Sequence, residues 1–233
     1  TINQDSIFVS TQPIGKLPNL FIVADGMGGH KAGDVASREA IERFVKYACT
    51  THMSDPANIL DAGIISVNKD IFDMANSNRD YSGMGTTFVA ASLVENHVYI
   101  ANVGDSRLYL IGRDIRQITR DHSLVEDMVR MGVLEREEAR THYKKNVITK
   151  AIGVADDKTS TPDIFEIEVE NGDKLLLCSD GLTNMVEDYD IKKIVKDNDS
   201  IEDAVRELIK QANENGGKDN ISAILIEPEI GEE

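Results

Sequence analysis

Five aspartates stand at the ends of apolar segments, where their carboxylates could act together. They are Asp5, Asp25, Asp105, Asp180 and Asp219. If these segments are strands, their ends are rigid, and carboxylates gathered there repel one another unless a cation neutralises the charge. Oxygen ligands of this kind suit Mg²⁺ or Mn²⁺. The pattern therefore indicates a divalent metal site bound by carboxylates.

Turn formation is the alternative explanation for each aspartate taken alone. Asp25 precedes Gly26 and Asp180 precedes Gly181, and Asp and Gly often make turns between strands. Five such aspartates in one chain favour the metal site. Their positions alone do not name a reaction.

Zinc fits the sequence less well than Mg²⁺ or Mn²⁺. Neither the five histidines nor the two cysteines, Cys49 and Cys178, show the spacing of zinc ligands. Cys49 falls late in a predicted helix and Cys178 in an apolar strand, where cysteine usually acts as a small hydrophobic residue. Two isolated cysteines are typical of cytoplasmic proteins, so we expect a cytoplasmic location.

The composition favours one acidic globular domain over residues 1–233. Apolar residues make up 41% of the chain, enough for a substantial core, and the net charge is −16. Such a charge argues against a nucleic-acid partner, because phosphate backbones need a basic surface. No apolar run approaches the roughly 20 residues that span a bilayer, so no membrane segment is expected in this chain.

Short apolar runs predict strands around these aspartates. They cover residues 7–10, 20–24, 86–94, 97–103, 107–111, 163–169, 173–178 and 221–226. Several of them are adjacent in hairpin-like pairs, while the helices come in separate blocks. That order predicts an α+β fold with antiparallel sheets rather than a parallel sheet of alternating strands and helices.

Three helices are predicted between the strands. One covers 34–48, with Asp34 as its N-cap, and a second covers 57–76. The third opens at a Ser200 cap and stops at a pair of glycines. Residues 122–150 are polar and contain only short helical patterns.

Seven short motifs surround the aspartates and follow one another along the chain. They are Asn3-Gln4-Asp5, Val23-Ala24-Asp25-Gly26-Met27-Gly28-Gly29-His30, Met84-Gly85-Thr86-Thr87, Asn102-Val103-Gly104-Asp105-Ser106-Arg107, Thr119-Arg120-Asp121-His122-Ser123, Cys178-Ser179-Asp180-Gly181-Leu182-Thr183 and Lys218-Asp219-Asn220-Ile221-Ser222. In this order they resemble the signature motifs of the bacterial type 2C metal-dependent serine/threonine protein phosphatase family. The resemblance covers nearly the whole chain.

The resemblance implies a four-layer α-β-β-α sandwich, in which two antiparallel sheets are flanked by helices and the metals lie in a cleft at one end. It also implies a single phosphatase catalytic domain, with a flap subdomain at about 131–150 beside the cleft. In this flap, His142, Lys144 and Lys145 would either meet a phosphopeptide or belong to an ordinary solvated loop.

The implied function is the hydrolysis of phosphoserine and phosphothreonine in proteins. A metal-bridging water at a binuclear Mn²⁺ or Mg²⁺ centre would attack the phosphate, and bacterial relatives add a weaker third ion. The implied partners are phosphorylated proteins and a cognate bacterial serine/threonine kinase, whose action the enzyme would oppose. We expect a monomer.

Carried over residue by residue, the motifs assign the ligands of the first two ions. Asp25 would bridge both ions, and Gly26 would offer its backbone carbonyl to one of them. Asp180 and Asp219 would complete the protein ligands of the other ion.

Three further roles come from the same resemblance. Asp5 would hold metal-bound water and orient the attacking one, and Asp105 would join Asp180 at the third ion. His30 would be the general acid that protonates the leaving oxygen. The family's phosphate-gripping arginine would fall just before Thr1.

Three alternatives stand beside this interpretation. A non-catalytic phosphatase-like domain would have lost an acidic ligand, whereas Asp25, Asp180 and Asp219 are all present. An enzyme that dephosphorylates anti-sigma antagonists would keep the catalysis but change its role. A purely structural α+β domain would leave the strand-end aspartates without a purpose.

Overall fold

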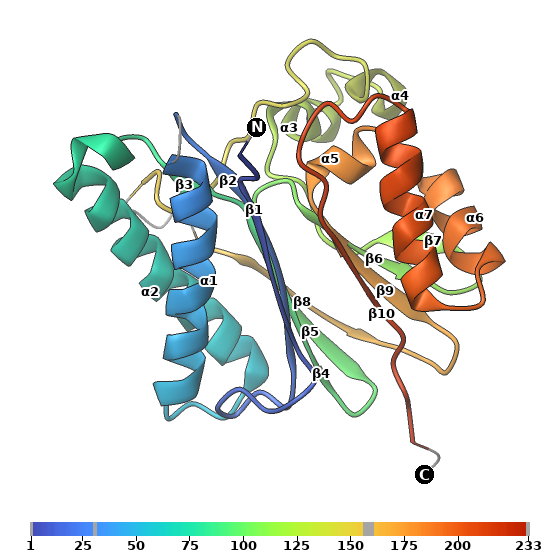
Figure 1. The fold of residues 1–233 in the computed structure, drawn as a ribbon, viewed down its shortest axis with the longest axis horizontal. Helices are drawn as coiled ribbons and strands as arrows, with labels where there is room; N and C mark the ends of the chain where they lie inside the picture. Colours follow the sequence, from blue (N-terminus) through green and yellow to red (C-terminus); the bar gives the residue numbers. More distant parts are fainter. Residues whose placement is uncertain (1, 30–31, 156–160, 232–233) are drawn as a thin grey trace.

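Two antiparallel β-sheets pack face to face in the centre of the molecule, and helices cover the outer face of each (Figure 1). The computed structural model describes residues 2–29, 32–155 and 161–231. The architecture is the expected four-layer α-β-β-α sandwich.

The first sheet has the spatial order β1-β2-β4-β5-β8, with β3 paired to β2. Its strands are β1 (Asp5–Ser10), β2 (Leu20–Met27), β3 (Gly85–Thr86), β4 (Phe88–Val94), β5 (His97–Val103) and β8 (Asp163–Glu168). The second sheet has the order β10-β9-β6-β7. Its strands are β6 (Arg107–Ile111), β7 (Ile115–Gln117), β9 (Lys174–Cys178) and β10 (Ala223–Ile226).

Two helices lie against each sheet. Helices α1 (Ala32–Thr50) and α2 (Pro56–Ser77) cover the first sheet, and α6 (Asp188–Asp197) and α7 (Ile201–Glu214) cover the second (Figure 1). Shorter helices occupy the loops: η1 (Arg79–Tyr81), α3 (Leu124–Arg130), α4 (Arg136–Ala139) and α5 (Asp180–Thr183). Within the described part of the chain, none of the helices combines the length and the apolar character needed to cross a membrane.

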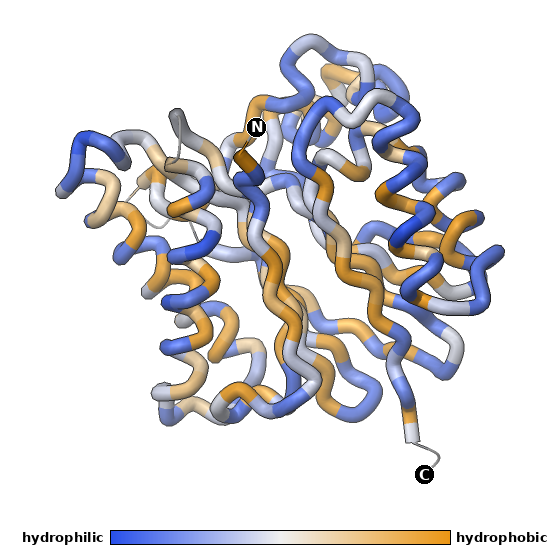
Figure 2. Tube along the Cα trace, in the orientation of Figure 1, coloured by the Kyte–Doolittle hydropathy of each residue, from blue (hydrophilic) through white to orange (hydrophobic). Residues whose placement is uncertain are grey.

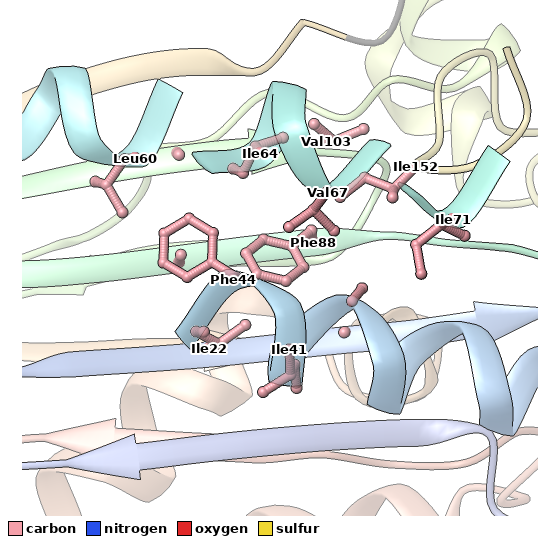
Figure 3. Close-up of a cluster of buried hydrophobic side chains, with 14 of the residues drawn as sticks. Ile22, Ile41, Phe44, Leu60, Ile64, Val67, Ile71, Phe88, Val103 and Ile152 are labelled. Atoms are coloured by element: carbon pink, nitrogen blue, oxygen red, sulfur yellow. The ribbon is translucent and has the colours of Figure 1, made fainter. Parts of the chain in front are cut away.

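Apolar side chains fill each space between adjacent layers. Between α1 and the first sheet, the rings of Phe44 and Phe88 pack with their centroids 5.4 Å apart (Figure 3). Strand β9 is apolar on both faces because it is covered on both: Leu177 points between the sheets, whereas Leu176 packs toward α6 and α7. Figure 2 shows the result as hydrophobic strands in the centre and hydrophilic loops outside.

Most elements lie where the sequence predicts them. The Ser200 side chain caps α7 by accepting a hydrogen bond from the Asp203 N–H, as expected. The prediction of Asp34 as an N-cap was wrong, because α1 begins at Ala32 and Asp34 lies in its first turn. The first turn of α1 packs tightly on β2: Gly33 lies so close to Gly26 that a methyl group on Gly26 would be 1.9 Å from the Gly33 carbonyl oxygen.

The strand ends near the aspartates meet at one end of the sandwich. Asp25 lies near the end of β2, and Asp180 follows β9 at the start of α5. Asp105 lies in the turn that carries the chain from β5 in the first sheet to β6 in the second. Both sheets therefore contribute to one site.

Candidate metal centre

A polar cleft of about 310 Å³ opens at this end of the sandwich. Its wall is formed by Gln4, Asp25, Gly26, Met27, Gly28, Thr87, Asp105, Asn146, Ile148, Asp180, Asp219 and Asn220. Four of the five aspartates singled out in the sequence therefore face one space. The fifth, Asp5, stands opposite Asp25 in the β1–β2 ladder and is buried behind the wall.

The backbone of Asp25 is held from both sides by two threonines. Thr87 Oγ1 accepts a hydrogen bond from the Asp25 N–H at 2.9 Å, and the Thr87 N–H donates to the Asp25 carbonyl at 2.9 Å. Thr86 Oγ1 donates to the same carbonyl at 2.9 Å. Thr87 Oγ1 is in turn 2.7 Å from Ser106 Oγ. This network fixes the position from which the Asp25 carboxyl enters the cleft.

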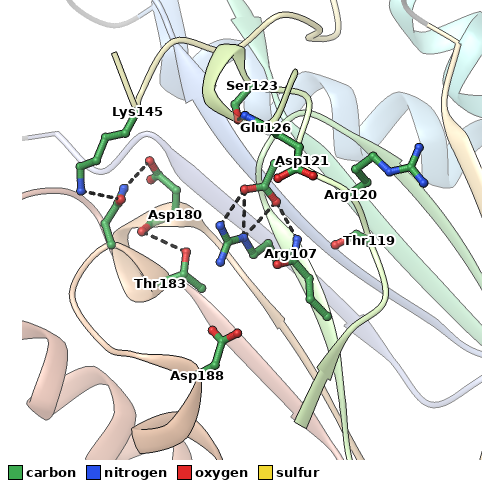
Figure 4. Close-up of polar contacts among 12 residues, drawn as sticks. Arg107, Thr119, Arg120, Asp121, Ser123, Glu126, Lys145, Asp180, Thr183 and Asp188 are labelled. Atoms are coloured by element: carbon green, nitrogen blue, oxygen red, sulfur yellow. Dashed lines mark hydrogen bonds and ion pairs between the residues drawn. The ribbon is translucent and has the colours of Figure 1, made fainter. Parts of the chain in front are cut away.

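Asp180 is held by a polar chain that reaches the flap. Asn184 Nδ2 donates to Asp180 Oδ2 at 2.8 Å, and Lys145 Nζ donates to Asn184 Oδ1 at 2.9 Å (Figure 4). Asn184 stands one helical turn after Asp180, at the C-cap of α5. On the buried side of the cluster, Ser179 Oγ donates to Asp5 Oδ2 at 2.8 Å.

The crowding of the acids changes their ionisation. Burial, together with repulsion from the neighbouring carboxylates, raises the pKa of Asp25 to about 9. Burial and the charge of Asp180 likewise raise the pKa of Asp105 to about 8. The pKa values of Asp5 and Asp180 are also raised, mainly by burial. Without a cation, these groups cannot all carry their negative charges at neutral pH.

In the part of the chain that the structure describes, two buried carboxylate oxygens have no hydrogen-bond partner. They are Asp5 Oδ1 and Asp180 Oδ1. Buried polar atoms normally find a partner, so unpaired carboxylate oxygens beside a polar cleft fit a centre that binds cations and their water. In the described residues, no three His, Cys, Asp or Glu side chains form a cage for an ion by themselves. The donor set therefore suits Mg²⁺ or Mn²⁺, because such ions keep several waters as ligands.

A half-buried arginine lies near the acids, but its charge is already paired with a carboxylate. Arg107 binds Asp121 in a bidentate pair, with Nε 2.9 Å from Oδ1 and Nη2 2.7 Å from Oδ2 (Figure 4). Gln117 Nε2 also donates to Asp121 Oδ1 at 2.8 Å. The Arg107–Asp121 ion pair therefore does not neutralise the aspartates of the cleft, and a bound cation is needed for that.

Several residues of the site were given no role from the sequence, although Thr87 and Asn220 lie within its motifs. Thr87 and Asn184 hold Asp25 and Asp180, and Asn220 Oδ1 accepts a hydrogen bond from the Gln4 N–H at 2.9 Å. Asn184 had a signal, since it follows Asp180 by four residues in a helical segment. His30 lies outside the described residues, so its role as general acid stays a prediction.

The flap contributes directly to the cleft. Asn146 and Ile148 line the cleft wall. Of the two adjacent lysines in the middle of the flap, Lys145 reaches Asn184, whereas Lys144 Nζ lies 5.4 Å from the centre of the Tyr143 ring. The arrangement places one flap cation, Lys145, at the rim of the carboxylate site.

Comparisons of the sequence with known proteins find a matching family and relatives. Residues 15–221 match the family model for protein phosphatase 2C. The serine/threonine phosphatase stp of Listeria innocua serovar 6a is 45% identical over 214 residues, which cover 89% of this chain and 84% of that protein.

Solved structures give the same result. Serine/threonine phosphatase Stp1 from Staphylococcus aureus has a TM-score of 0.90 at 39% identity, and the match covers 98% of this chain and 90% of that one. The catalytic domain of serine/threonine protein phosphatase PstP, solved in complex with two manganese ions, has a TM-score of 0.83 at 31% identity. That match covers 96% of this chain and 90% of the other.

Proposed function

Because the chain belongs to the protein phosphatase 2C family and is a metal-dependent protein serine/threonine phosphatase that uses Mn²⁺ or Mg²⁺, we propose that the aspartate cluster is its metal centre. One observation carries this proposal: buried carboxylates with raised pKa values and unpaired oxygens border a single polar cleft. Such an arrangement is unfavourable until cations bind.

The mutual repulsion within the cluster supports the ligand assignments. Asp25 is repelled by each of the other four aspartates, which suits a ligand that bridges two ions, with the Gly26 carbonyl beside it. Asp180 is repelled by Asp219 more than by any other charge, and we assign this pair to one ion. Asp105 is repelled most by Asp180, and we assign that pair to a third ion.

When bound, the ions supply Lewis acidity, which lowers the pKa of water and offsets the charge on the phosphoryl oxygens. The chain's own residues do the positioning. The threonines hold Asp25, and Asn184 orients Asp180. Asp5 Oδ1, which has no hydrogen-bond partner among the described residues, would accept a hydrogen bond from water and orient it. His30 is proposed as general acid on its motif alone.

The enzyme acts on phosphorylated proteins, and we propose that these are products of a bacterial serine/threonine kinase that it opposes. We also propose that the protein is a monomer. A reducing, cytoplasmic location is proposed because Cys49 and Cys178 are free thiols.

A phosphothreonine peptide tests the proposal. Purified protein should release phosphate with Mn²⁺ or Mg²⁺, and excess chelator should abolish the release. Asp25→Asn should abolish it too, whereas Asp199→Asn, which changes an exposed acid in the loop before α7, should not. Normal turnover by the Asp25 variant would overturn the assignment of the metal centre.

A further inference from the structure

The turn that carries Asp105 between the two sheets is tightly constrained. Gly104 has a φ of +104°, and a methyl group there would lie 2.7 Å from the Thr87 side chain. Thr87 is the residue that holds the Asp25 backbone on both sides. A shift of this turn would therefore move Asp105 relative to Asp25.

One residue from a distant part of the sequence binds both backbone groups of Gly104 in this turn. The Gly104 N–H donates to His122 Nδ1 at 3.0 Å, and the His122 N–H donates to the Gly104 carbonyl at 2.9 Å. The two residues thus form a closed pair across 18 positions of the chain. Within the described residues, no other histidine ring accepts a hydrogen bond from the backbone next to one of the clustered aspartates.

The same histidine also holds the end of the flap. The Thr149 N–H donates to the His122 carbonyl at 2.8 Å. His122 Nε2 lies 3.3 Å from Asp163 Oδ2, close but not aligned as a hydrogen bond. Lys150 Nζ lies 3.5 Å from the other oxygen of Asp163. His122 therefore stands between the Asp105 turn and the two residues that close the flap.

The contacts determine which ring nitrogen carries the proton. Because Nδ1 accepts a hydrogen bond from a backbone amide, the neutral ring must be protonated at Nε2, which faces the Asp163 carboxylate. Burial, together with the charge of Lys150, lowers the pKa of His122, which favours the neutral ring. Its Nδ1 lone pair is thus available to hold Gly104.

We propose that His122 is a positioning residue, which fixes Asp105 in the metal centre through Gly104 and keeps this turn in register with the end of the flap. It touches neither substrate nor ion. The inference rests on the proposed function, because it requires Asp105 to be a metal ligand. A merely structural role predicts that any polar replacement of the same size would serve equally well.

Two amide replacements separate these explanations. In His122→Asn, the side-chain oxygen can take the place of Nδ1 and accept from Gly104, but the contact with Asp163 is lost. In His122→Gln, the amide reaches toward Asp163 instead and the acceptor for Gly104 is lost. We expect the Gln variant to bind Mn²⁺ at its weakest site about tenfold less tightly than the wild type, with the Asn variant close to the wild type.

Calorimetric titration of the metal-free proteins with Mn²⁺ measures this difference without any assay of activity. Equal loss in both variants, or no loss in either, would overturn the role of His122. If the wild type itself bound no Mn²⁺, the proposed metal centre would fail, and the two failures are therefore distinguishable. Thermal unfolding in chelator checks that both variants are folded.

A spectrum of the unmodified protein tests the inference even if the variants do not fold. Long-range ¹⁵N–¹H correlation of the metal-free wild type should show His122 as the Nε2–H tautomer, with Nδ1 as an acceptor. An Nδ1–H tautomer would exclude the bond from Gly104 and overturn the proposal.

Discussion

Replacing Asp25 with asparagine should make the metal-free protein more stable while it removes the phosphatase activity. Asp25 stands among four other carboxylates, and its pKa is raised from 3.8 to about 9 by burial and by their repulsion. Asparagine has nearly the same shape and no charge. It should therefore relieve the repulsion without opening a cavity, at the expense of a proposed metal ligand.

The gain in stability should depend on pH. In the unfolded chain, Asp25 ionises near its ordinary pKa of 3.8, whereas the folded chain keeps the proton up to about pH 9. The contribution of this carboxyl to the free energy of unfolding is therefore fully present below about pH 4 and is lost as the pH rises toward 9. The asparagine variant has no such loss.

The size of the effect follows from the same shift. One pH unit corresponds to about 1.4 kcal/mol, so the roughly three units between the ordinary pKa and neutrality set a ceiling of about 4 kcal/mol. Neighbouring carboxyls also take up protons, and water in the open cleft screens part of the repulsion. We therefore expect a gain of about 1–2 kcal/mol, or a rise in melting temperature of about 4 °C.

Thermal unfolding in excess chelator measures this gain. At about pH 7 the variant should melt above the wild type, and at about pH 4.5 the two should nearly coincide. Adding Mn²⁺ should raise the melting temperature of the wild type but not that of Asp25→Asn, and Asp199→Asn serves as the matched control. A variant that melts below the wild type in chelator near neutral pH would refute the reasoning about carboxylate crowding.

Three further predictions concern the packing and the flap. Gly26→Ala should destabilise the fold by about 3 kcal/mol, because its methyl group would lie 1.9 Å from a backbone carbonyl oxygen of α1. Gly29→Ala is the control, since its methyl group would meet nothing within 4 Å, and chemical denaturation compares the two variants. Phe44→Ala should cost about 4 kcal/mol in the same assay, and a loss below 1 kcal/mol would contradict its fully buried position. Lys145→Gln should raise KM for a phosphopeptide about fivefold, which corresponds to about 1 kcal/mol, whereas Lys144→Gln should change KM little. Equal effects of the two variants on KM would argue against a special role for Lys145 at the cleft rim.

Local patterns predicted the elements that bury an apolar face or carry a clear cap. The run at 173–178 is apolar at every central position, and it became a strand covered on both faces. Helix α6 was not predicted, because only Ile191 and Val195 are fully buried in a segment otherwise rich in charge. Asp34 shows the opposite error, in which a good capping residue lies inside a helix whose first turn packs tightly on β2.

The aspartates that gather at the candidate site could be identified from the sequence, whereas the residues that hold them in place could not. Aspartates next to glycine after apolar runs are visible in the sequence, and the family motifs give them roles. The pairing of residue 5 with residue 25 depends on which strands become neighbours, which no local pattern contains. His122 illustrates the same limit, since its contact with Gly104 joins two loops.

The position of the aspartates across the two sheets has a mechanical consequence. Asp25 belongs to the first sheet, whereas Asp180 and Asp219 flank strands of the second. Ions bound by all three would therefore link the two sheets at the end of the sandwich where the cleft opens. Each ion at one hundred times its dissociation constant would add about 2.7 kcal/mol to the free energy of unfolding. The melting temperature would then report how much free metal surrounds the protein, and the enzyme would be most rigid under the same conditions that make it active.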